Sequence, residues 1–202
     1  MAYNQFTIPQ LERDFGLRIN KQSGLFAAAP PAPISDLLRL TLAQNSRLAL
    51  PSGSEKARSE YLIAPILAEV CQQKREQASL FSGIEFDVDV PRGLSGYCDF
   101  LFSLTPDALV ISAPVVSVVE AKKENILAGI PQCLAELIAA QIFNAAQQHP
   151  VEILYGVVTT GTDWQFLSLQ KTIATIDSDL YYLANVEKIV GILLTMLQHN
   201  IH

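Results

Sequence analysis

Histidine and cysteine are scarce in this 202-residue chain, which contains three of each. Cys71, Cys98 and Cys133 lie far apart and form no CxxC pair. The sequence therefore argues against a zinc knuckle or a disulfide framework, and we expect buried free thiols. The three histidines show no ligand spacing with one another. A histidine-based metal site and a Ser-His-Asp triad accordingly have little support.

Long apolar runs are also missing, although half of the residues are hydrophobic and only 17% are charged. No run approaches the roughly 18 apolar residues of a membrane span, and the closest candidate, IVGILLTML, is about half that length. The N-terminal stretch MAYNQFTIPQLERDFG has neither the basic region nor the apolar region of a secretion signal. We therefore expect a cytoplasmic protein that does not associate with membranes.

Basic residues are outnumbered, with 14 Lys and Arg against 20 Asp and Glu, for a net charge of −6. This balance argues against a protein that coats nucleic acid nonspecifically. The charge is unevenly spread: residues 1–58 carry seven basic and four acidic groups, whereas residues 59–202 carry seven basic and sixteen acidic groups. The N-terminal segment is therefore the part expected to contact a polyanion.

A proline-rich stretch, AAAPPAPIS at residues 27–35, divides the chain. Consecutive prolines favour extended polyproline geometry, which is typical of a linker. A leucine-rich segment at residues 35–50 follows and predicts a helix that ends at Pro51–Gly53. We predict two parts: residues 1–53 form an N-terminal arm with a helix, and residues 54–202 form the core.

The order of elements after residue 54 predicts the fold class. A helix begins at Ser54, and Pro65 should kink it near Tyr61, because proline cannot donate the backbone hydrogen bond of a helix interior. Alternating or β-branched runs then predict three strands, followed by a long helix, two more strands and a last helix. The predicted ranges are 83–90, 94–104 and 115–123; 129–149; 151–160 and 163–170; and 185–200. This order indicates an α/β (α+β) domain with one mixed sheet flanked by helices.

Charged residues end the most apolar strand, VVSVVEAKK, and they need an explanation. If the second and third strands pair as antiparallel neighbours, Asp99 and Glu120 converge at one end of the sheet. Lys122 lies two residues beyond Glu120 and so points to the same side. Two carboxylates are suitable ligands for Mg²⁺, and a lysine beside them can stabilise negative charge on a phosphate. The simpler interpretation is that these are strand-end charges in water, joined by a surface ion pair.

This constellation resembles the PD-(D/E)XK nuclease superfamily, which has the restriction-endonuclease-like fold and an αβββαβ core. The resemblance covers roughly residues 54–170 and departs from the pattern at the proline of the PD motif, because Cys98 precedes the aspartate. The long Asp-to-Glu spacing implies an extended hairpin through Pro106 to Pro114. The residues that carry the resemblance are Asp99 in GYCDF, Glu120-Ala121-Lys122 in VVEAKK, Glu60 in ARSEYLIAPIL and Gln132 in GIPQCLAEL.

The resemblance implies metal-dependent cleavage of phosphodiester bonds, usually in DNA. Mg²⁺, with Mn²⁺ as a substitute, would be held by Asp99, Glu120 and the Ala121 carbonyl. Lys122 would assist the attacking water and the charge of the transition state. The two helical residues would have supporting roles: Glu60 would hold or orient a metal-bound water or a second metal, and Gln132 would position the lysine.

Two other functions remain open from the sequence. The first is a binding or assembly protein that keeps the nuclease fold without turnover, which the acidic balance and the scarcity of arginine clusters favour. Whether the protein is a nuclease or a binding protein, the apolar last helix would mediate homodimerisation. The second is an α/β domain unrelated to nucleic acid, with an enzyme site elsewhere. The residues expected on the apolar face of the last helix are Val186, Ile189, Val190, Leu193 and Leu197.

Overall fold

A mixed eight-stranded sheet forms the centre of the protein in a computed structural model that describes residues 2–106 and 109–200. The strand order is β1-β7-β6-β5-β4-β3-β2, with β8 paired to β6. β4 and β5 are parallel, as are β1 and β7, and the other pairs are antiparallel. The strands are β1 (Arg18–Gln22), β2 (Ser79–Glu85), β3 (Tyr97–Ser103), β4 (Val115–Ala121), β5 (Leu154–Thr159), β6 (Asp163–Gln170), β7 (Ile173–Asp177) and β8 (Tyr181–Tyr182).

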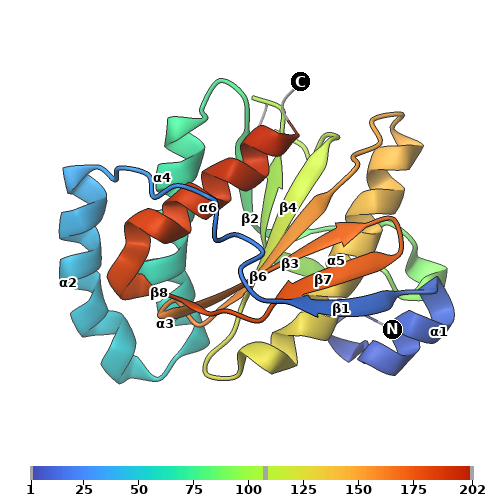
Figure 1. Cartoon of the computed structure of the whole chain (residues 1–202), viewed down its shortest axis with the longest axis horizontal. Helices are drawn as coiled ribbons and strands as arrows, with labels where there is room; N and C mark the ends of the chain where they lie inside the picture. Colours follow the sequence, from blue (N-terminus) through green and yellow to red (C-terminus); the bar gives the residue numbers. More distant parts are fainter. Residues whose placement is uncertain (1, 107–108, 201–202) are drawn as a thin grey trace.

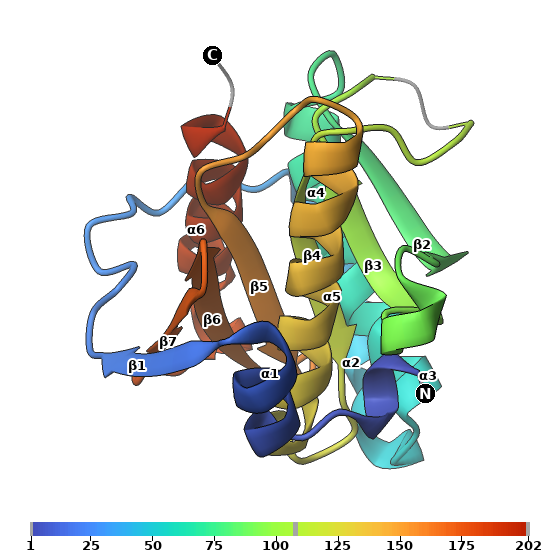
Figure 2. The ribbon, with the colours of Figure 1, turned by 90° about the vertical axis from the view of Figure 1, so that its right-hand side faces the viewer.

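Helices cover both faces of this sheet (Figures 1 and 2). The longer helices are α1 (Ile8–Phe15), α2 (Asp36–Ser52), α4 (Ala64–Gln73), α5 (Ile126–Ala146) and α6 (Val186–His199). One core cluster packs the sheet against α2, α4 and α6, and a second packs it against α5 and α1. The short elements are η1 (Tyr3–Gln5), α3 (Glu55–Arg58), η2 (Ser59–Ile63), η3 (Val90–Arg92) and η4 (Leu183–Asn185). The predicted α/β class, with one mixed sheet flanked by helices, is confirmed.

The central strand β4 is buried along its whole length, as its β-branched sequence predicts. It lies between β3 and β5, and α5 connects it to β5. This crossover makes β4 and β5 parallel, so their carboxyl ends lie at the same edge of the sheet. The charged residues that follow β4 are therefore placed at this edge, close to the first turn of α5.

Parts of the sheet differ from the sequence prediction. The strand predicted at 83–90 runs instead over Ser79–Glu85. Beyond it the chain forms a loop, in which Asp87 accepts from the Gly96 amide and Asp89 caps η3. Aspartate readily forms such side-chain-to-backbone bonds, and here they replace the strand ladder. The sequence prediction also missed β1, β7 and β8, and part of the hairpin predicted through Pro106 to Pro114 lies outside the described residues.

The kink predicted near Tyr61 takes the form of a π-helical turn, η2, between α3 and α4. The Ala64 amide donates to the Ser59 carbonyl, five residues back. Pro65 has no amide hydrogen to offer the Tyr61 carbonyl, which instead accepts from Asn45 Nδ2 of α2 at 3.0 Å. The proline thus widens one turn of the helix and ties it to its neighbour.

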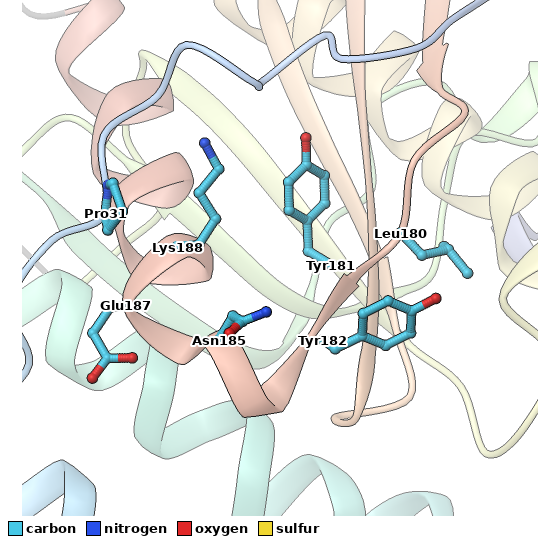
Figure 3. Close-up of a pocket in the computed structure, with 7 residues that line it drawn as sticks. All are labelled: Pro31, Leu180, Tyr181, Tyr182, Asn185, Glu187 and Lys188. Carbon is cyan, nitrogen blue, oxygen red and sulfur yellow. The ribbon is translucent and has the colours of Figure 1, made fainter.

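The segment expected as a linker lies directly on α6. Lys188 Nζ donates to the Phe26 and Ala27 carbonyls at 2.9 and 3.0 Å. Figure 3 shows that the Lys188 side chain points toward this segment, beside a cavity of about 350 Å³ that Pro31 and Tyr181 help to line. Residues 1–53 are also joined to the sheet, because β1 pairs with β7.

The apolar face of α6 packs into the core of its own chain. Val186, Ile189, Val190, Leu193 and Leu197 are each at most 8% exposed. The surface predicted to pair two copies is therefore covered within one molecule.

Helix α5 is long and apolar enough to cross a membrane, although the sequence prediction had considered only the α6 segment. In the most apolar 18-residue window of α5, 56% is buried inside the fold. The core helix of a soluble protein has the same properties, so this is weak evidence for a membrane span.

We predict that Gly191→Ala destabilises the fold by about 1–3 kcal/mol, because overpacking a tight contact costs about that much. A Cβ at Gly191 would lie 1.9 Å from the Pro30 carbonyl oxygen. Urea unfolding measures the change, and the exposed Gln198→Ala in the same helix is the control, expected within about 0.5 kcal/mol of the unmodified protein. An unchanged or higher stability of the Gly191 variant would show that residues 27–35 do not pack on α6 as described.

Candidate active site

Strand register brings the first two acidic residues together. Phe100 of β3 pairs with Val119 of β4 in antiparallel register, so the next step along both strands sets Asp99 opposite Glu120. The Ala121 amide donates to Asp99 Oδ2 at 2.8 Å, which fixes the aspartate against the end of β4. The backbone of two adjacent strands therefore positions both carboxyl groups.

The two carboxyl groups interact directly in a site with little access to water. Burial raises the pKa of Asp99, although the Ala121 hydrogen bond and a side-chain hydrogen bond with Glu120 lower it in part. Glu120 is only 1% exposed, and burial followed by repulsion from Asp99 raises its pKa to about 8. When both groups are ionised, two negative charges this close and this dry require a compensating positive charge.

Lys122 supplies that charge at the edge of the sheet. Its Nζ forms an ion pair with Glu120 Oε1 and donates to Gln132 Oε1 at 3.3 Å. Burial lowers the pKa of Lys122, but the attraction and hydrogen bond of Glu120, together with the charges of Glu55 and Asp99, outweigh this effect, so its pKa is raised overall. The Lys122 ammonium group is therefore held in its charged form between the side chains of Glu120 and Gln132.

A glycine in α5 makes room for the lysine stem. A Cβ at Gly129 would lie 2.6 Å from Val158 Cγ1 and 3.1 Å from Lys122 Cγ. Any larger residue would have to displace the lysine or push the first turn of α5 away from β5. The close approach of α5 to the sheet thus depends on this position.

Gln132 connects the strand residues to the interior of α5. Its Nε2 donates to Glu120 Oε2 at 2.8 Å and to Glu136 Oε1 at 3.1 Å, while its Oε1 accepts from Lys122. One carboxamide therefore contacts three charged or ionisable groups.

The helical acid nearest the cluster is Glu55 rather than the predicted Glu60. Glu55 Oε2 accepts from the Lys123 amide at 3.0 Å, and its charge acts on Asp99, Glu120 and Lys122. Glu60 instead forms an ion pair with Lys56 at 3.0 Å, and its side chain is 53% exposed. Sequence reasoning favoured Glu60 from the resemblance. The signal for Glu55 was its place in the first turn after the helix-capping Ser54.

The arrangement suits a small divalent cation only in part. Mg²⁺ is often held by one or two carboxylates together with water and substrate phosphate. Asp99 and Glu120 supply two carboxylates, and the raised pKa of each would fall beside a bound cation, because the cation attracts the ionised form. Among residues 2–106 and 109–200, however, no group of three or more His, Cys, Asp or Glu side chains is arranged to hold a metal ion. The donor set therefore fits a cation that keeps several water ligands.

Comparison with known proteins does not assign the chain to a family. No protein-family model matches the sequence, and no curated protein is significantly similar to it.

Proposed function

We propose that the protein is a metal-dependent phosphodiester hydrolase of endonuclease type that acts on nucleic acid, with DNA as the expected substrate. One observation carries the proposal: the carboxyl groups of Asp99 and Glu120 meet at the ends of adjacent strands, with the Lys122 ammonium group beside them. Metal-dependent cleavage of a phosphodiester uses a cation site together with a positive charge at the reacting phosphate.

The order of elements supports a restriction-endonuclease-like core. α4, β2, β3, β4, α5 and β5 follow one another along the chain in the αβββαβ order. β2, β3 and β4 are antiparallel neighbours, and β5 is parallel to β4. In this arrangement the two acidic residues come from the second and third strands of the core, as the resemblance to the PD-(D/E)XK superfamily implies.

The residues of the chain would divide the work as follows. Asp99, Glu120 and the Ala121 carbonyl would hold Mg²⁺, which when bound activates water and polarises the phosphate. Lys122 would turn from Glu120 toward the phosphate and stabilise the charge that develops there. Gln132 already contacts both Glu120 and Lys122, so it would hold Glu120 in place and limit the positions that Lys122 can reach when it turns.

A second function has its own support. Both oxygens of Glu120 already have partners, one in Lys122 and the other in Gln132. A site closed by internal bonds fits a nuclease-fold protein that binds nucleic acid or assembles with a partner without turnover. The two functions differ in whether a divalent cation displaces the lysine from Glu120, which a titration with Mn²⁺ detects as heat.

We predict that Glu120→Gln and Lys122→Met each reduce Mg²⁺-dependent cleavage at least 100-fold, because the first removes a carboxylate that would hold the metal and the second removes the positive charge beside the reacting phosphate. Nicking of supercoiled plasmid measures the rate, with and without a chelator. Glu60→Gln and Lys123→Met change the same residue types on exposed side chains, and they should cleave within about threefold of the unmodified protein. Metal-dependent cleavage that survives both site substitutions would contradict the assignment.

We predict that, without metal, the stability advantage of Glu120→Gln over the unmodified protein grows as pH rises from about 5 to 8. Glu120 has a folded-state pKa of about 8, above the ordinary value of 4.5, so in this window only the folded carboxyl retains its proton. Its contribution to stability then declines with pH, by up to about 1.4 kcal/mol per pH unit.

Thermal unfolding at several pH values measures this difference. Addition of Mn²⁺ at pH 8 should raise the unfolding midpoint of the unmodified protein and leave that of the variant nearly unchanged. A pH-independent difference between the two proteins would mean that Glu120 is not held in a dry site. Equal metal stabilisation of both would place the cation elsewhere.

A further inference from the structure

One carboxyl group in the structure is buried more deeply than any role assigned so far requires. Glu136 lies in the middle of α5 with its side chain 0% exposed. Its Oε1 accepts from Gln132 Nε2 at 3.1 Å, whereas its Oε2 has no hydrogen-bond partner. It neither contacts solvent nor forms an ion pair in the described structure.

This carboxyl group costs stability. A buried polar atom without a partner costs about 1–3 kcal/mol, and an apolar side chain of similar size would avoid the cost. The surroundings are themselves apolar, since the helix carries a buried face that includes Cys133, Leu134 and Leu137. Burial, followed by repulsion from Glu120, raises the pKa of Glu136 well above its usual range. The fold alone gives no reason for a glutamate here.

The contact with Gln132 does give a reason. A glutamine side chain can turn end over end, which exchanges its oxygen and nitrogen at nearly the same positions. With the nitrogen toward Glu136 and Glu120, the oxygen faces Lys122 and accepts from it. In the reversed orientation the amide hydrogens would face an ammonium group and the oxygen would face two carboxyl oxygens. Glu136 therefore favours one of the two orientations.

We propose that Glu136 is a positioning residue that fixes the orientation of the Gln132 carboxamide and, through it, the placement of Lys122 and Glu120. The proposal rests on the proposed function, because the lysine and glutamate matter only if the cluster is a site. Glu136 itself touches neither substrate nor metal. Its effect reaches the phosphate only through Gln132, so its removal should lower kcat and leave KM nearly unchanged.

The test compares Glu136→Leu with Glu136→Gln. Leucine removes the acceptor, whereas glutamine retains a carbonyl oxygen that can accept from Gln132. The two possible roles of the Glu136 carboxyl group lead to opposite results for the leucine variant. If the group stabilises the fold, its loss lowers the unfolding midpoint; if it positions Gln132 at a cost in stability, its loss raises the midpoint. Gln141→Leu makes a similar polar-to-apolar change later in the same helix and serves as the control.

Three measurements are made on the full chain. NMR follows hydrogen exchange of the Gln132 side-chain amide, thermal unfolding gives the midpoint, and plasmid nicking gives kcat and KM. For Glu136→Leu we expect at least tenfold faster exchange of one Gln132 amide proton and a midpoint raised by about 2 °C or more. We also expect at least a tenfold lower kcat. Glu136→Gln should restore protection and most of the activity, and Gln141→Leu should change none of the three.

The exchange measurement separates this proposal from the proposed function. One outcome is that the unmodified protein shows no cleavage while the Glu136→Leu substitution still speeds exchange of the Gln132 amide and raises the unfolding midpoint. That result would support the positioning role of Glu136 and contradict the proposed nuclease function. Unchanged exchange in Glu136→Leu would overturn the positioning role, whatever the activity. A lowered midpoint would also overturn it, since the carboxyl group would then be structural. Should the leucine variant not fold, loss of amide protection in Glu136→Gln would overturn the proposal by itself.

Discussion

The hydrogen bond from the Ala121 amide to Asp99 is the contact on which the site depends. It joins a main-chain donor at the end of β4 to a side chain on β3, so the distance between the two carboxyl groups is set by strand pairing rather than by loops. Sites held by strands are positioned more precisely than sites held by loops. The price is mutual repulsion between Asp99 and Glu120, which the adjacent ammonium group of Lys122 offsets.

Helix α5 has two tasks that conflict. It fills one face of the sheet as an almost wholly apolar core helix, and it also presents Gln132 and Glu136 to the end of β4. Polar residues in such a helix are stable only when they bond one another. The row formed by Lys122, Glu120, Gln132 and Glu136 meets this requirement at every step but the last, where one oxygen of Glu136 stays without a partner.

The parts of the fold that follow from local pattern were predictable from the sequence. The run VVSVVEA could hardly be anything but a central strand, and its charged end placed Glu120 and Lys122 at the sheet edge. The strand RINKQ could not be recognised, because its side chains are mostly exposed and its pairing with β7 joins residues far apart in sequence. The orphaned oxygen of Glu136 was equally hidden, since burial of one helix face depends on which strands it covers.

The π-helical turn at Ser59–Ile63 lies between Glu55, which contacts the site, and the rest of the helix, and so it affects which acidic residue reaches the site. A continuous α-helix repeats every 3.6 residues, and a π-turn adds a residue to one turn, so it rotates everything before it about the helix axis. Deleting one residue there would restore a regular spiral while swinging Glu55 to a different side. The number of residues between Ser54 and Pro65 therefore determines the direction of each side chain around the helix axis, and with it which acidic residue on this helix faces the end of β4.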